Sequence, residues 1–457
     1  MQETSNAGAR GHGVTQREAF AVWLRVAALS FGGPAGQIAV MHRIIVEEKK
    51  WVSESRFLHA LNYCMLLPGP EAQQLATYLG WLMHRTRGGL IAGGLFILPG
   101  AAAIMALSFV YALWGETGIV SSIFFGLKSA VLAIVVEAML RVGKRALKSG
   151  AMRALAATAF AMIFFFAVPF PAIVLAAGLI GFFAARAGHP AFLPAGDKAA
   201  ASDAGSLLGS DTPEHTRPSP ARAIGAAAVW LAAWLAPVAT IAIFAGPESV
   251  FTHIGLFFSK MAVVTFGGAY AILAYAAQQA VTTFHWVSAA EMLNGLGMAE
   301  TTPGPLIMVL QYVGFMAAFR SPGDLPPLLA GAFGGLLTTW ATFAPCFLWI
   351  FVGGPYIEQL RANRALSGAL AAITAAIAGV ILNLALWFAI HTLFRQTTHV
   401  GAYGLSFDSP FLVSADLWSF VLAGAAALAV FRFKAGTFVT LAGCCAAGLA
   451  LYFAGAL

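Results

Sequence analysis

Apolar stretches follow one another along most of the chain, each long enough to approach the roughly 20 residues that a helix needs to cross a bilayer. They are too long for the alternating strands of about ten residues found in an outer-membrane barrel. The pattern therefore predicts an all-α polytopic membrane protein. The first set of stretches covers 18–41, 57–84, 88–114, 119–142, 151–168 and 170–185, a further one covers 223–245, and a second set begins near 257, 289, 326, 365, 411 and 435.

The composition agrees with this pattern. Of the 457 residues, 60% are hydrophobic and only 10% are charged, against about 25% charged residues in a soluble domain. The first 17 residues are polar and lack the apolar core of a removable signal peptide, so we expect the first membrane segment to direct insertion. The net charge of +7 fits basic cytoplasmic loops better than nucleic-acid binding. The four cysteines lack paired spacing, and we expect no metal, cofactor or catalytic centre.

The sequence repeats itself when it is shifted by 235 positions. The shift places Arg25 on Lys260 and superimposes three motifs: Phe31, Gly32 and Gly33 on Phe266, Gly267 and Gly268; Trp51, Val52 and Ser53 on Trp286, Val287 and Ser288; and Pro68, Gly69 and Pro70 on Pro303, Gly304 and Pro305. We therefore expect two copies of one unit of about six membrane segments.

The copies should be inverted relative to each other in the bilayer. We assign residues 1–185 to the first copy, 186–222 to a flexible cytoplasmic linker rich in Ala, Ser, Pro, Gly and Asp, and 246–457 to the second copy. One extra transmembrane helix, 223–245, precedes the second copy, and an odd insertion reverses the orientation of every segment after it. Inverted repeats are typical of secondary transporters.

The two Pro-Gly-Pro motifs predict helix breaks inside the membrane. Proline interrupts a helix but suits its first position, so we expect a half-helix over 70–83 that begins at membrane depth. The free amides and the dipole at such a start attract anions. The distribution of Lys and Arg favours a cytoplasmic N-terminus with the first two segments of each copy as re-entrant hairpins, although segments that cross fully stay open.

These breaks, two matched cations and their neighbours form the predicted anion site. A charge within a membrane segment is costly and usually faces a cavity or a partner, which favours Arg25 and Lys260 as ligands. Glu71 and Glu300 flank the breaks and are our candidates for proton coupling. Each feature also has a structural interpretation, as a joint, a packing contact or a snorkelling side chain. The predicted substrate-binding residues are Arg25, Phe31, Gly32, Gly33, Pro68, Gly69, Pro70, Glu71, Lys260, Gly267, Gly268, Thr301, Thr302, Pro303, Gly304 and Pro305.

At these residues the chain resembles the chromate ion transporter family in its long, two-domain form. The first copy carries FGGPAGQIAVMHR and LLPGPEAQQLATYLGW, and the second carries FGGAYAILAY and WVSAAEMLNGLGMAETTPGP. The resemblance implies chromate export from the bacterial cytoplasm across the inner membrane, driven by the proton motive force and giving chromate resistance. The residues alone indicate only an oxyanion transporter.

Two alternatives and one property stay open. Sulfate shares the charge and tetrahedral shape of chromate, so a sulfate or other oxyanion permease is the alternative function, with sulfate as a competitor for the site. A membrane-embedded enzyme such as a chromate reductase would call for a flavin, haem or thiol pair, and the sequence carries no dinucleotide fingerprint or paired cysteines. A homo-oligomer is compatible with the sequence, which does not decide the oligomeric state.

Overall fold

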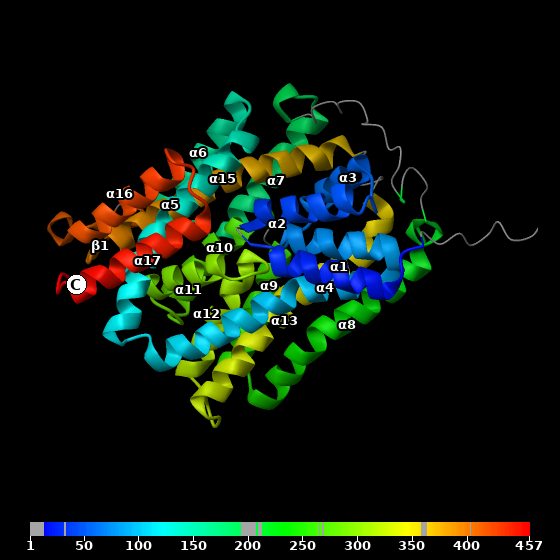
Figure 1. Cartoon of the computed structure of the whole chain (residues 1–457). Coiled ribbons are helices and arrows are strands. Elements are labelled where there is room, and N and C mark those ends of the chain that lie inside the picture. The colour runs from blue at the N-terminus through cyan, green and yellow to red at the C-terminus, as the bar shows by residue number, and fades with distance from the viewer. Residues whose placement is uncertain are drawn as a thin grey trace, which may run out of the picture.

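The computed structural model describes residues 13–31, 33–192, 207–208, 213–264, 266, 269–357, 363–402 and 404–457. Helices dominate these residues, in agreement with the predicted all-α membrane fold (Figure 1). The described exception is a hairpin of two antiparallel strands, β1 (Thr397–Ala402) and β2 (Leu405–Pro410). Among the described residues, five helices are long and apolar enough to cross a membrane: Glu71–Trp114, Gly118–Ala146, Pro220–Ala245, Pro327–Tyr356 and Arg364–Leu393.

The helices fall into two successive groups joined by one long helix. The first group consists of α1 (Gln16–Leu29), α2 (Gly33–Met41), η1 (His42–Glu48), α3 (Glu54–Cys64), α4 (Glu71–Trp114), α5 (Gly118–Ala146), α6 (Gly150–Phe166) and α7 (Phe170–Arg186). The connection contains η2 (Pro190–Phe192), η3 (Glu214–Thr216) and α8 (Pro220–Ala245). The second group consists of α9 (Val250–Val264), α10 (Ala269–Gln278), η4 (Gln279–Thr283), α11 (Ala289–Thr301), η5 (Leu306–Met308), α12 (Val309–Arg320), α13 (Pro327–Gly353), η6 (Gly354–Tyr356), α15 (Arg364–Leu393), η7 (Leu412–Ser414), α16 (Leu417–Phe431) and α17 (Thr437–Phe453).

Helix α4 is a folded-back pair of helices rather than one rod. Its backbone leaves the helical region at His84 and at Arg85, whose φ is 52°. Gly80 then packs directly against the carbonyl of Gly88, an approach that only residues without a bulky side chain allow. The turn at 84–85 lies at the end of the predicted segment 57–84, before the segment 88–114 begins. Helices α12 and α13 form the corresponding pair in the second group.

The two groups follow the same order of elements. A π-helix (η1 or η4) ends the second helix of each group, and the unusual positive φ of Lys50 (52°) recurs at His285 (52°), 235 positions later. Helices α6 and α7 begin 267 positions before α16 and α17, and α7 also ends 267 positions before α17. These correspondences support the predicted repeat, although the domain limits themselves stay a prediction.

The last two helices of each group, α6 and α7 or α16 and α17, pack against the long helix of the other group. Helix α5 packs against α16 and α17, whereas α15 packs against α6 and α7. Gly126 of α5 lies on the backbone of Cys444, and Gly181 of α7 lies on the backbone of Gly368. Small residues at helix contacts are what allow such close packing in a membrane, where the hydrophobic effect between helices is absent.

Both hairpins of the first group begin and end at one end of the molecule. His84 Nε2 lies 2.9 Å from the carbonyl oxygen of Val14, which precedes α1. Lys49, just after η1, lies 3.3 Å from Glu18 in the first turn of α1. We call this the first end. Two hairpins, α1–η1 and the pair formed by α3 and the start of α4, both begin and end there. This is the arrangement expected of hairpins that enter and leave the membrane on one side.

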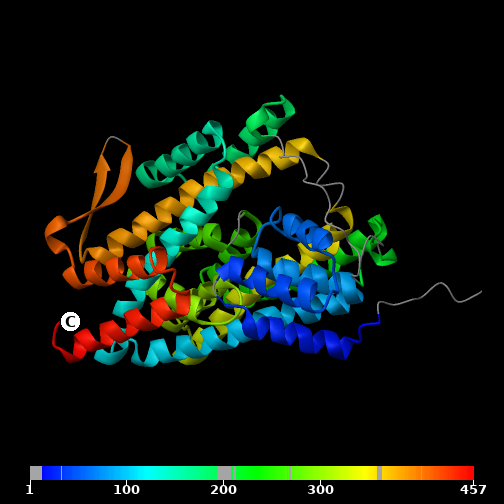
Figure 2. The same cartoon turned by 45° about the horizontal axis from the view of Figure 1, so that its top comes forward.

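The hairpins of the second group begin and end at the opposite end of the molecule. The rings of His253 in α9 and Phe284 after η4 lie 6.3 Å apart, and Arg320 at the end of α12 donates to the carbonyl of Trp286 at 2.8 Å. We call this the second end. The second part of α4 runs from the first end to the second and is about 40 Å long, from a rise of 1.5 Å per residue. The C-terminus and the β-hairpin lie at the left of Figures 1 and 2, away from the start of α1.

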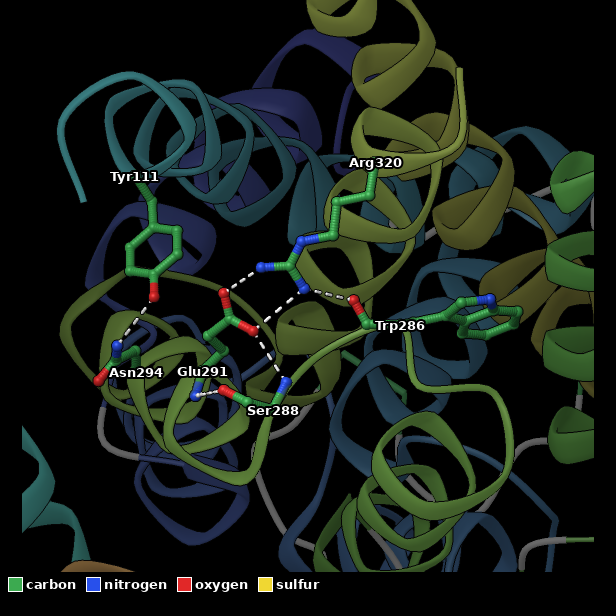
Figure 3. A network of polar contacts seen from close by, with 6 residues as sticks. All are labelled: Tyr111, Trp286, Ser288, Glu291, Asn294 and Arg320. Carbon is green, nitrogen blue, oxygen red and sulfur yellow. Dashed lines mark hydrogen bonds and ion pairs between the residues drawn. The ribbon is translucent and has the colours of Figure 1, made fainter. Parts of the chain in front are cut away.

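A polar network ties the helix ends together at the second end (Figure 3). Glu291 accepts from the amide of Ser288 at 2.8 Å in a capping box and also pairs with Arg320. Asn294, one turn further along α11, donates to the hydroxyl of Tyr111 at 3.2 Å. The network therefore holds the start of α11, the end of α12 and the end of α4 in fixed relation.

The connection between the groups and the β-hairpin both rest on the first group. Within the connection, the amide of Leu208 donates to the carbonyl of Trp51 at 3.0 Å, and His215 lies 2.9 Å from the carbonyl of Trp81. In the hairpin, Phe407 packs its ring against Phe164 at 5.7 Å, so the strands lie over the end of α6.

Candidate functional site

The break in the second group is hydrogen-bonded to the break in the first. Gly304, the centre of the second Pro-Gly-Pro motif, has a φ of 93° and donates its amide to the carbonyl of Ser30 at 2.9 Å. Its own carbonyl accepts from Gln37 Nε2 at 2.6 Å. Ser30 ends α1 and Gln37 lies in α2, so both flank the Phe-Gly-Gly break. The fold therefore brings a tip of one group against the broken helix of the other.

Each Pro-Gly-Pro tip also lies against the middle of a long helix. A Cβ placed on Gly304 would lie 3.1 Å from the Cα of Gly100, which follows Pro99 in α4. A Cβ placed on Gly69, whose φ is 112°, would lie 3.1 Å from the sulfur of Cys346, which follows Pro345 in α13. The two tips therefore occupy equivalent positions inside the helix bundle, and at both a glycine is required by the backbone conformation.

The first tip exposes unpaired polar groups to the interior. Pro70 precedes α4, which begins at Glu71 as the motif predicted, and the first amides of any helix lack partners within it. Within the described part of the chain, the buried atoms Glu71 Oε2, Gln73 Oε1 and Gln74 Oε1 have no hydrogen-bond partner. Buried polar atoms in proteins are normally satisfied, so a cluster of unsatisfied ones indicates a place where water, ions or substrate complete the bonding.

Glu300 is the buried carboxylate of the second tip. It lies at the end of α11, is 2% exposed and accepts from the hydroxyl of Tyr270 at 3.2 Å. Tyr270 also faces the first group, because a Cβ placed on Gly33 would lie 3.6 Å from its hydroxyl. The charges of Arg141 and Glu137 on α5 are near enough to act on this pair.

Two of the predicted substrate-binding residues beside the second tip, Thr301 and Thr302, donate their hydroxyls to carbonyls of α11. Thr301 donates to the carbonyl of Met298 at 2.8 Å, and Thr302 donates to the carbonyl of Ala299 at 3.3 Å. In this conformation they offer oxygen lone pairs rather than protons to the site. Phe31 packs edge-on against Phe438 of α17 at 5.1 Å, which places the first break next to the start of that helix.

The two predicted cations lie on exposed helix faces. Arg25 is half exposed and forms a 2.6 Å ion pair with Glu48, a partner that the sequence did not indicate. It lies five residues before Ser30, about 7 Å along α1 from the break. Lys260 occupies an exposed position on α9. Their role in binding stays a prediction, and the predicted residues Gly32, Gly267 and Gly268 lie outside the described residues.

Several site residues were not singled out from the sequence. Ser30, Gln37, Gln73 and Gln74 are each at most 1% exposed and lie within 8 residues of a glycine break, and Tyr270 binds the buried Glu300. The available signal was the presence of glutamine inside otherwise apolar membrane segments, because buried polar side chains there are expensive and need partners.

Comparison with known proteins identifies the family. The profile of the chromate transporter family matches residues 17–182 and 252–449. This chain belongs to the chromate transporter family. It is therefore a multi-pass membrane transporter, in agreement with its long apolar helices.

Curated relatives in this family cover most of the chain. A chromate transport protein of Cupriavidus metallidurans is 26% identical over 375 residues, which are 81% of this chain and 83% of that protein. A chromate transport protein of Pseudomonas aeruginosa is 30% identical over 371 residues, 79% of this chain and 78% of the relative. A probable chromate transport protein of Synechococcus elongatus is 28% identical over 368 residues, 79% of this chain and 82% of the relative. No solved structure matches the chain significantly.

Proposed function

We propose that this transporter exports chromate, a tetrahedral dianion, from the bacterial cytoplasm across the inner membrane, driven by the proton motive force and giving chromate resistance. The substrate follows from the family and from relatives named as chromate transport proteins. The observation that carries the site is the contact between the two breaks, in which Gly304 bonds to Ser30 and to Gln37.

The proposed binding mode uses backbone rather than a dense cluster of charges. The first amides after Pro70 and after Pro305 begin helical segments at the two tips, where unpaired N–H groups and the helix dipole favour an anion. Arg25 of α1 and Lys260 of α9 supply balancing positive charge from the other hairpin of each group. The two groups rock around this fixed site, which faces each side of the membrane in turn.

Glu71 and Glu300 are the proposed proton carriers. Both side chains are held inside the bundle next to a tip, one with a buried unpaired oxygen and the other bonded to Tyr270. A carboxyl in such a position exchanges its proton only when the site opens to one side. Binding of the dianion would then be linked to the protonation state of the nearby carboxyl.

The proposed orientation places the N-terminus and the first end in the cytoplasm. Basic residues crowd the helix ends there, among them Lys144, Arg145, Lys148 and Lys434, as the positive-inside tendency predicts. An inside-negative potential contributes about 2.3 kcal/mol per charge per 100 mV, so roughly 4.6 kcal/mol favours the exit of a dianion. Export therefore needs less coupling than import.

Uptake of radiolabelled chromate into inverted membrane vesicles tests the proposal. We expect accumulation that needs the proton motive force, that an uncoupler abolishes and that a large excess of sulfate leaves largely intact. Uptake that sulfate suppresses would move the physiological substrate to sulfate or another oxyanion. Energised vesicles that take up neither radiolabelled chromate nor radiolabelled sulfate would contradict the transport proposal itself.

A further inference from the structure

Two cavities occupy corresponding places at opposite ends of the molecule. The first-end cavity, about 460 Å³, lies between α5 and the turn from α16 to α17; its lining includes Glu137, Arg141, Lys144, Phe431 and Lys434. The second-end cavity, about 310 Å³, lies between α15, α10 and the turn from α6 to α7, beside the β-hairpin; its lining includes Phe164, Ala167, Asn383, Trp387 and Ile390.

Helix packing shows that the two cavities are built from corresponding residues. Gly448 of α17 lies against Ser122 of α5, and Gly181 of α7, 267 positions earlier, lies against Gly368 of α15. This contact sets the alignment of α5 with α15 at 246 positions. The turns agree as well, because Lys434 and Ala167 are also 267 positions apart and share a left-handed backbone, with φ of 51° and 49°.

Corresponding positions differ in charge. The alignment pairs Glu137, Arg141, Lys144 and Lys434 of the first-end cavity with Asn383, Trp387, Ile390 and Ala167 of the second-end cavity. At these positions the first-end cavity holds three cations and one carboxylate, whereas the second-end cavity holds none. Arg141 forms a 2.6 Å ion pair with Glu137, so Lys144 and Lys434 provide the excess positive charge.

The β-hairpin adds two titratable groups to the lining of the second-end cavity. His399 Nδ1 and Asp408 lie 3.0 Å apart and pair with each other across the two strands. The pair contributes no excess positive charge, because a carboxylate balances the imidazole even when that ring is protonated. The contrast between the two cavities therefore holds when the hairpin is included.

The first-end cavity adjoins the helix breaks. Lys434 lies four residues before Phe438, whose ring packs on Phe31 at the first break. On the other wall, the charges of Arg141 and Glu137 act on the buried Glu300 beside the second tip. An anion held at Lys144 and Lys434 would thus stand between the aqueous end of α5 and the site formed by the breaks.

We propose that the first-end cavity is the vestibule in which the tetrahedral dianion collects before it reaches the breaks, and that the second-end cavity is its counterpart without excess positive charge, through which the anion leaves. A cleft lined by one sign of charge raises the local concentration of its counter-ion. The exit cavity lacks that attraction, so it does not retain the departing anion. The inference rests on the proposed function, because it assumes an anionic substrate that moves from the first end to the second.

The double variant Lys144→Gln with Lys434→Gln tests the vestibule. Both side chains are exposed, so the fold should tolerate the change. We expect a KM for chromate in inverted vesicles raised by roughly tenfold, the lower end of the range for electrostatic concentration in a cleft, with Vmax preserved and with the difference shrinking at high ionic strength. The matched control is Arg145→Gln with Lys148→Gln, which removes the same charge at the same end from residues outside the cavity lining. An unchanged KM in the test pair, or an equal rise in the control pair, would overturn the proposal.

The reverse variant Ala167→Lys places a lysine at the position equivalent to Lys434. Lys434 itself shows that lysine adopts this backbone conformation. We expect a lower KM when chromate is offered from the second end in counterflow, with no change from the first end. An unchanged affinity from the second end would contradict the proposed charge asymmetry.

Two further arms separate the vestibule from other outcomes. In vesicles of purely zwitterionic lipid, a KM difference that disappears would assign the lysines to an anionic lipid headgroup and overturn the proposal. If the wild-type protein carries no chromate, the variants are compared for binding of radiolabelled sulfate and molybdate to purified protein. Loss of dianion binding in the lysine pair alone would support the vestibule even though the chromate proposal had failed, and equal binding in all variants would overturn both.

Discussion

The two groups of helices share their framework but differ in the chemistry placed on it. At the second tip, Gly304 is clamped by Ser30 and Gln37 of the other group and lies against the backbone of Gly100. At the first tip, Gly69 lies against the ends of two side chains, Gln74 and Cys346. The broken helices thus recur in both groups. Differences between corresponding residues determine which tip is held rigidly and where positive charge is available.

The largest expected effect comes from substituting the glycine of the clamped tip. Gly304→Ala introduces a side chain at a positive φ and 3.1 Å from the Cα of Gly100, which cannot move without shifting α4. Gly69→Ala meets the same backbone strain, of order 1–3 kcal/mol, but its neighbours are side-chain ends that can rotate. We expect Gly304→Ala to abolish chromate uptake and Gly69→Ala to reduce it only partly.

Uptake per inserted protein, with melting temperature as a control for folding, checks this difference. Equal loss in both variants would show that the two tips are equally rigid and that the cross-group contacts of Gly304 are unimportant. A retained melting temperature in Gly304→Ala together with lost uptake would place the defect in the site rather than in assembly.

The two carboxyls beside the tips should also differ in their effect on net uptake, with Glu300 at the clamped tip more important than Glu71 at the first tip. If Glu300 carries the coupled proton with Tyr270 as its partner, Glu300→Gln should lose energised net uptake while anion exchange across the membrane continues. Tyr270→Phe removes the hydroxyl at 3.2 Å and should slow net uptake without abolishing it. Glu71→Gln, at the first tip, is the matched comparison, and full net uptake in Glu300→Gln would move the coupling role to Glu71 or away from both.

The matched cations provide a smaller and more diagnostic comparison. Arg25 has Glu48 as a partner at 2.6 Å, and an exposed ion pair contributes only about 0–1 kcal/mol to stability. If Arg25 acts on the anion, Arg25→Ala and Lys260→Ala should both raise KM while Glu48→Gln should not. Identical defects in Arg25→Ala and Glu48→Gln would instead show that the pair only holds α1 against η1.

Glycine and proline made much of this fold predictable from the sequence. The Pro-Gly-Pro motifs fix φ or permit positive φ, and both breaks and the start of α4 lie where these residues predict. The contacts between the breaks were not predictable, because Ser30 and Gly304 are far apart in the chain and meet only through the packing of the two groups. The β-hairpin was missed although Gly404, with a φ of 81°, and the alternating residues around it are typical of one.

The partner of Arg25 shows why charges within membrane segments are hard to interpret from sequence. The free-energy cost of placing a charge within the membrane predicts that such a residue faces either a cavity or a partner, but it does not distinguish between the two. Glu48 is 23 residues away and becomes the partner because α2 and η1 return alongside α1. The hairpin geometry therefore supplies the ion-pair partner of Arg25, and only the fold contains that information.

The smallest effect is expected from removing the N-cap residues of α6 and α16, Ser149 and Asp416, which are 267 positions apart. Ser149 accepts from the amide of Met152 at 3.2 Å, and loss of such a cap costs about 1 kcal/mol. Asp416 accepts from the amide of Ser419 at 3.0 Å and also from Arg395 at 2.8 Å, which anchors the β-hairpin. We expect Asp416→Ala to lower the melting temperature more than Ser149→Ala, and Arg395→Gln to reproduce only the difference between them. Equal melting temperatures for the two cap variants would show that the hairpin is anchored by the contact of Phe407 with Phe164 rather than by the ion pair.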